Sequence, residues 1–130
     1  MPHFSSRLYL RFAGEATRKE KLSSFFLTAS DGSHHSLWEM LGKNDLLEGT
    51  LKPQALKALV EQLAEHCGEV LIAADTLASD QEPTLWQYVW DGDDLSTLVI
   101  TGPAARSLRN KPLSETHFLS LDDPDHPLEH

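Results

Sequence analysis

Hydrophobic and polar residues alternate near the start of the chain. In residues 7–12 the even-numbered positions, from Leu8 to Phe12, are apolar, and arginine or tyrosine stands between them. A period of two places all the apolar side chains on one face of an extended strand. Residues 7–12 are therefore predicted to form a half-buried β-strand.

The next segment, residues 15–29, fits two structures. Its apolar residues from Leu22 to Ala29 have the i, i+3, i+4, i+7 spacing of a helix that buries one stripe. Residues 23–28 also have the composition of a strand. We favour the helix and keep the strand as the alternative. The Asp-Gly-Ser sequence at 31–33 predicts a turn after this element.

A capping box predicts a short helix. Ser36 can accept a hydrogen bond from the amide three residues later, and Glu39 can reach back to the serine amide. Gly42 is placed to end the helix. The core contacts expected from this helix are Leu37, Met40 and Leu41.

The clearest element is a long helix over Pro53–Cys67. Proline suits its first turn, because a missing N–H costs nothing there. Gly68 follows where a left-handed cap residue belongs. The apolar stripe of this helix consists of Leu56, Leu59, Val60, Leu63 and Cys67.

The second half of the chain predicts mainly strands. The short apolar run at 69–74 lacks alternation, which is typical of a strand covered on both faces. Residues 85–90 and 95–101 are separated by the Asp-Gly-Asp-Asp sequence, which predicts a β-hairpin. Further along, a short helix is predicted at 103–110 and a last strand at 116–121.

These elements predict a single α+β domain over residues 1–121. Its centre is a mixed, mostly antiparallel sheet of about five strands, packed against the helix at about 53–67 and two or three short helices. Residues 122–130 are acidic and interrupted by proline, and are predicted to form a flexible tail. Residues 128–130, Leu-Glu-His, have the sequence that begins a common expression tag.

Composition favours a folded domain that needs no covalent cross-links. Of the 130 residues, 40% are hydrophobic and 24% charged, close to the average for globular domains. One cysteine excludes a disulfide framework. Residues 1–4 lack the start of a secretory signal, and the longest aliphatic run, Val70–Ala74, is too short for a bilayer span. We therefore expect a cytoplasmic protein.

Charge is distributed unevenly. The formal net charge is −9, and the segment from Ala58 to Ala105 has no lysine or arginine. Such an acidic field disfavours binding to phosphate backbones and accelerates encounters with basic proteins. The alternative is that the charge serves only solubility. The acidic residues of this segment are Glu61, Glu65, Glu69, Asp75, Asp80, Glu82, Asp91, Asp93 and Asp94.

Three aromatic residues share one face of the predicted strand at 85–90, while Leu85 and Val89 share the other. If the aliphatic face is core, the aromatic face can anchor a partner. If the aromatic face is core, its role is structural, because aromatic rings contribute large burial energies. On the first interpretation the hairpin acids steer a basic partner. The predicted partner-binding residues are then Trp86, Tyr88, Trp90, Asp91, Asp93 and Asp94.

Metal and nucleophile chemistry have weaker support. Oxygen-rich turns such as 91–94 can hold Ca²⁺ or Mg²⁺, but aspartate and glycine are ordinary turn residues. His35 and Glu39 are four residues apart and could supply two ligands if the helix began a turn early, yet two ligands do not make a site. Cys67 lies at the C-terminal end of a helix, where the dipole opposes a thiolate, so it is predicted to be a core residue.

The sequence contains no Gly-x-Ser-x-Gly, His-Glu-x-x-His or phosphate-binding glycine motif. The prediction is a non-catalytic interaction module of the inhibitor or immunity type with a basic protein partner. One alternative is a small enzyme or ligand-binding domain with a cleft around His34, His35 and Glu39. Another is a homodimer formed through the aromatic face. We expect no cofactor, no metal, and neither nucleic acid nor a membrane as partner.

Overall fold

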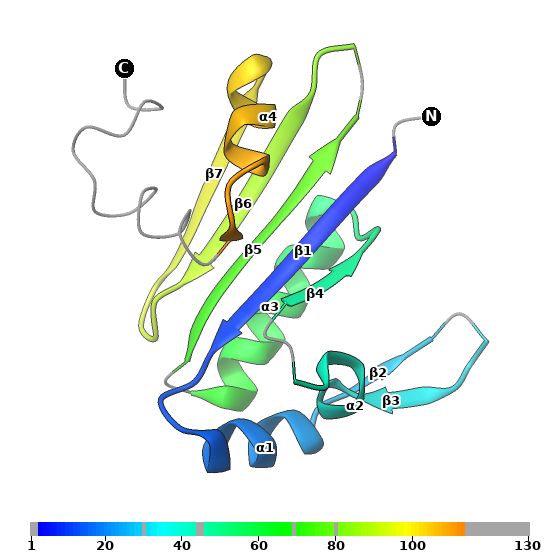
Figure 1. The fold of residues 1–130 in the computed structure, drawn as a ribbon, viewed down its shortest axis with the longest axis vertical. Helices are drawn as coiled ribbons and strands as arrows, with labels where there is room; N and C mark the ends of the chain where they lie inside the picture. Colours follow the sequence, from blue (N-terminus) through cyan, green and yellow to red (C-terminus); the bar gives the residue numbers. More distant parts are fainter. Residues whose placement is uncertain (1–2, 30, 44–45, 69, 80, 114–130) are drawn as a thin grey trace.

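The alternating N-terminal segment forms β1 (Phe4–Arg11), the second strand of a five-stranded antiparallel sheet (Figure 1). Each neighbouring pair in this sheet is antiparallel. The computed structural model describes residues 3–29, 31–43, 46–68, 70–79 and 81–113. The strands in spatial order are β4 (Leu46–Gly49), β1, β5 (Leu71–Ala78), β6 (Thr84–Trp90) and β7 (Leu95–Thr101).

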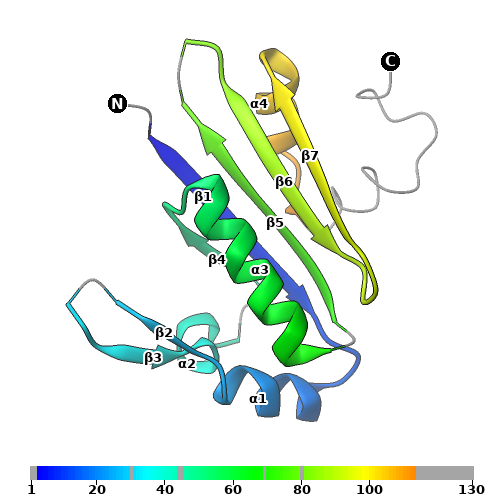
Figure 2. The same ribbon diagram turned by 180° about the vertical axis from the view of Figure 1, so that it is seen from behind.

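Helices lie on both faces of the sheet. The 15-residue helix α3 (Pro53–Cys67) covers one face and α4 (Pro103–Arg109) lies against the other (Figures 1 and 2). The larger hydrophobic core, which contains Leu10 and Leu63, lies between α3 and the sheet, and a smaller one lies under α4. The predicted α+β class and the sheet packed on the long helix are confirmed. The central strand β5 is buried on both sides, as its apolar sequence predicts.

The segment predicted as one helix at 15–29 contains both of the structures considered for it. The helix α1 (Glu15–Ser23) buries Leu22, and β2 (Phe26–Thr28) follows as a strand. The hydroxyl of Ser24 donates back to the carbonyl of Glu20 at 3.0 Å, and the helix ends there. The expected helix is therefore wrong beyond residue 23. Phe26, placed on its apolar stripe, is 59% exposed.

The second strand of this small hairpin leads directly into the predicted short helix. β3 (His34–Ser36) pairs with β2, and α2 (Leu37–Leu41) begins after it. The cap is confirmed, because Oγ of Ser36 accepts a hydrogen bond from the amide of Glu39 at 3.2 Å. The predicted core contacts Leu37 and Leu41 are buried, but the prediction is wrong for Met40, whose side chain is exposed.

The predicted ends of α3 are confirmed. Pro53 occupies its first turn, and Gly68 follows with φ of 69° while its amide bonds to the carbonyl of Ala64. Within the described ranges, none of the helices combines the length and apolarity needed to cross a bilayer. The predicted strand at 116–121 and the tail at 122–130 lie outside the described residues.

Candidate interaction surface

The aromatic residues of β6 lie on the face of the sheet that packs against α3. Tyr88 is only 3% exposed and belongs to the larger core, while Trp86 and Trp90 are half-buried against it. The opposite face of β6 is also buried, since Leu85 and Val89 lie on the α4 side. Tyr88 is therefore a core residue, and only the two tryptophans retain surface that another molecule can reach.

Trp90 forms one wall of a groove between α3 and the β6–β7 hairpin. The groove has a volume of about 360 Å³. Its floor is apolar, and two glutamates of α3 stand at its rim. We call it the acidic groove. It is lined by Val60, Glu61, Ala64, Glu65, Trp90 and Leu95.

A hydrogen bond fixes the indole in this groove. Nε1 of Trp90 donates to the carbonyl of Gly68 at 3.3 Å, just beyond the end of α3. Glu61 and Glu65 are exposed, and neither forms an ion pair with any other described residue. Their carboxylates are thus available to a positively charged group that enters the groove.

The turn of the β6–β7 hairpin, residues 91–94, lies at the same end of the sheet as the C-terminal end of α3 (Figure 2). Asp91, the first acidic residue of this turn, stabilises the turn itself. Oδ1 of Asp91 accepts hydrogen bonds from the amides of Asp93 at 2.9 Å and Asp94 at 2.8 Å. These backbone donors, that of Asp94 first, lower the pKa of Asp91. Asp93 and Asp94 are exposed and make no ion pair within the described part of the chain.

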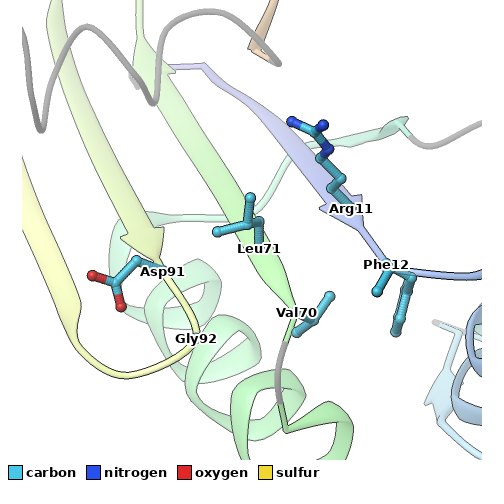
Figure 3. A pocket seen from close by; sticks show the side chains of 7 residues that line it. Arg11, Phe12, Val70, Leu71, Asp91 and Gly92 are labelled. Atoms are coloured by element: carbon cyan, nitrogen blue, oxygen red, sulfur yellow. The ribbon is translucent and has the colours of Figure 1, made fainter.

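A second hollow lies on the other side of this turn, at the ends of β1 and β5. Its volume is about 540 Å³, and Val70 and Leu71 line it together with Arg11 and Phe12. Figure 3 shows the carboxylate of Asp91 directed away from these apolar side chains. This geometry agrees with the role of Asp91 in its own turn.

The histidines of the alternative site lie on the small hairpin. Nδ1 of His34 is 3.0 Å from Oγ1 of Thr28, and Nδ1 of His35 is 3.7 Å from a carboxylate oxygen of Glu39. A shared helix face for His35 and Glu39 would require the helix to begin a turn earlier, but His35 lies on β3 and α2 begins at Leu37. Within the described residues, no group of three His, Cys, Asp or Glu side chains is placed to hold a metal.

Cys67 is buried at the end of α3. Burial raises the pKa of its thiol to about 11. The thiol is thus protonated at neutral pH, and the prediction of a core residue is confirmed.

A buried charge cluster that was not predicted from the sequence lies between the sheet and α4. Asp75 has no exposed surface, and its carboxylate accepts hydrogen bonds from two arginines. Nε of Arg7 lies 3.0 Å and Nη1 of Arg109 lies 3.2 Å from Oδ1 of Asp75. Burial lowers the pKa of Arg109, and Asp75 opposes that shift. The single acid inside the apolar run of β5 was the signal that could have revealed this cluster.

Asp75 therefore adds nothing to the acidic surface. Of the other acidic residues in the segment from 58 to 105, six are exposed, while residues 69 and 80 lie outside the described residues.

Gln87 lies opposite Asp75 on β6 and is 1% exposed. Neither its amide oxygen nor its amide nitrogen has a hydrogen-bond partner among the described residues.

The chain was compared with known protein families, with curated proteins and with solved structures. None of the three comparisons finds a match.

Proposed function

We propose that this chain is a non-catalytic interaction domain that binds a basic protein through the acidic groove. The observation that carries the proposal is the position of Trp90 beside Glu61 and Glu65. A lysine or arginine can lay its aliphatic stem and its charge against an indole. Its head group would then lie near the two carboxylates at the rim.

The turn of the β6–β7 hairpin adds negative charge beside the acidic groove. Asp93 and Asp94 are exposed at the end of the sheet where Trp90 bonds to Gly68. A partner that enters the groove from this end meets their negative field first. Such a field raises the association rate of an oppositely charged protein and is weakened by salt.

The test is an affinity capture with paired charge variants. Wild-type chain, the E61Q/E65Q variant and an E20Q/E48Q control are immobilised and exposed to lysate of the source cells. The control removes the same charge from exposed positions on α1 and β4. Bound proteins are eluted in a salt gradient and identified by mass spectrometry.

The expected result is one basic protein captured equally by wild type and control. Its capture by E61Q/E65Q should be about tenfold weaker, from about 0.7 kcal/mol at each carboxylate. Equal capture by all three chains contradicts the proposal, as does an acidic partner or an empty eluate at low salt.

A second candidate function is the ligand-binding or enzymatic cleft around His34, His35 and Glu39. Its support is the 3.7 Å approach of His35 to Glu39 beside an apolar groove of about 440 Å³ that includes Met40 and Leu59. Titration with Zn²⁺, followed by NMR of the histidine rings, tests the metal version. Saturable shifts confined to His34 and His35 would favour it, and their absence would count against it.

A further inference from the structure

β7 is an edge strand without the usual protection of an edge. It pairs with β6 on one side and ends the order of described strands on the other. Its sequence, Leu-Ser-Thr-Leu-Val-Ile-Thr, contains no charge and no proline. Val99 is 52% exposed. Natural edges are commonly blocked by lysine, proline or a bulge, because an unprotected edge offers free N–H and C=O groups to another strand.

The opposite edge of the sheet is different. β4 has only four residues and carries Glu48 at its centre. β7 has seven residues, and β-branched side chains are frequent along it. Of the two edge strands, β7 therefore has the length and composition that favour pairing with a further strand.

The acidic groove lies beside this edge. Leu95 belongs both to β7 and to the groove, and the α3-facing side chains of β7 continue from it through Thr97 to Val99. Figure 2 shows that α3 lies over β1 and β5 and not over β7. An added strand would lie about 4.8 Å from β7 and place every second side chain on the α3 side. Long basic side chains at these positions can extend toward Glu61 and Glu65.

We propose that the partner contributes an extended basic segment that pairs with β7 as a sixth strand. This inference rests on the proposed function and adds the chemistry of the recognised segment. Its residues on the α3 side are lysine or arginine, matching the glutamates of the groove. Those on the other side are apolar or small, matching Ser96 and the half-buried Leu98. Main-chain hydrogen bonds supply affinity, and the alternating side chains supply specificity.

The experiment uses two capped peptides of roughly ten residues, the length of a long strand. In one peptide lysine alternates with valine, and in the other glutamate replaces lysine. NMR amide exchange is measured on the full chain alone and with each peptide. Sedimentation gives the oligomeric state throughout.

The lysine peptide should slow exchange at alternate amides of β7 by at least about tenfold at saturation. The glutamate peptide should leave the exchange unchanged. V99K should weaken binding of the lysine peptide by about tenfold, since an edge lysine opposes strand addition. F26K is the matched control at another exposed apolar residue, and it should bind like the wild type.

Three results would overturn strand addition. In the first, the peptide binds and shifts the signals of Glu61 and Glu65 while exchange at β7 is unchanged, which would leave the proposed function intact. In the second, neither peptide binds, and the capture experiment alone then judges the proposed function. In the third, alternate β7 amides are protected before any peptide is added, by a second copy in a dimer or by the chain's own residues in a monomer. Equal binding of both peptides would contradict the basic character of the segment.

Discussion

The indole of Trp90 is held by the carbonyl of Gly68, with 3.3 Å between Nε1 and the oxygen. The bond joins the last residue of β6 to the cap of α3, so that the groove wall and the helix rim keep a fixed spacing. Glu65 lies three residues before Gly68 on the same helix end. A basic side chain in the groove thus meets the indole of Trp90 and, one helical turn before Gly68, the exposed carboxylate of Glu65.

Trp90 should report directly on binding in the groove. In a W38F/W86F background it is the only tryptophan of the chain. The alternating lysine–valine peptide should change its emission with a saturable dependence on peptide concentration, because the peptide changes the polarity around the indole. In a W86F/W90F background, where Trp38 remains near α1, the same titration should leave the emission unchanged. Equal responses in the two backgrounds would contradict binding beside Trp90.

Asp75 should be essential for stability. D75N leaves two partly buried guanidinium groups, those of Arg7 and Arg109, without their counter-charge. We expect a loss of about 3–5 kcal/mol in the free energy of unfolding. D93N removes an exposed acid of the hairpin turn and should change stability by less than about 0.5 kcal/mol. Urea unfolding of both variants checks this, and equal stability of the two would refute the role of the cluster.

Replacing Gln87 by leucine should increase the free energy of unfolding. Its buried amide has no hydrogen-bond partner among the described residues, and an unsatisfied buried polar group costs about 1–3 kcal/mol. Q87L should therefore raise the free energy of unfolding by about that amount. Q54L, at an exposed position of α3, is the control and should be close to neutral. A destabilised Q87L would show that the amide is in fact hydrogen-bonded, for example by water.

Cys67 should make stability depend on pH in the alkaline range. Burial raises the pKa of its thiol to about 11 from an ordinary value of 9.0. The folded state therefore holds the proton more tightly than the unfolded state. The resulting stabilisation is complete below pH 9 and is lost as the pH rises toward about 11.

The measurement is urea unfolding across this range for wild type and C67A. Other groups titrate here too, so the difference between the two chains is the quantity of interest. The stability of wild type relative to C67A should fall with rising pH. A constant difference would mean that the thiol has the same pKa in the folded and unfolded states.

Local signals in the sequence were sufficient for much of the fold. Pro53 and Gly68 mark the ends of α3 because each has a conformational preference that acts within one turn. The β6–β7 hairpin was predicted for the same reason, since aspartate and glycine define its turn. Residues 15–29 were harder, because helix and strand patterns overlap there and the pairing of β2 with β3 decides between them.

The site depended on contacts that sequence patterns do not contain. Trp86, Tyr88 and Trp90 were correctly placed on one face, but which face meets α3 is set by tertiary packing. The burial of Asp75 was not predicted, because its partners are 68 and 34 residues away in sequence. Likewise, Glu61 and Glu65 came together with Trp90 only through the packing of α3 on the sheet.

Binding through the acidic groove is tested most directly by carboxyl footprinting of the complex with the captured partner. A carbodiimide couples an amine to accessible carboxylates, and mass spectrometry measures the labelling of each residue. The partner should lower labelling at Glu61 and Glu65, while Glu20 and Glu48 should be labelled as in the free chain. Unchanged labelling at Glu61 and Glu65, with protection elsewhere on the surface, would contradict binding through the acidic groove.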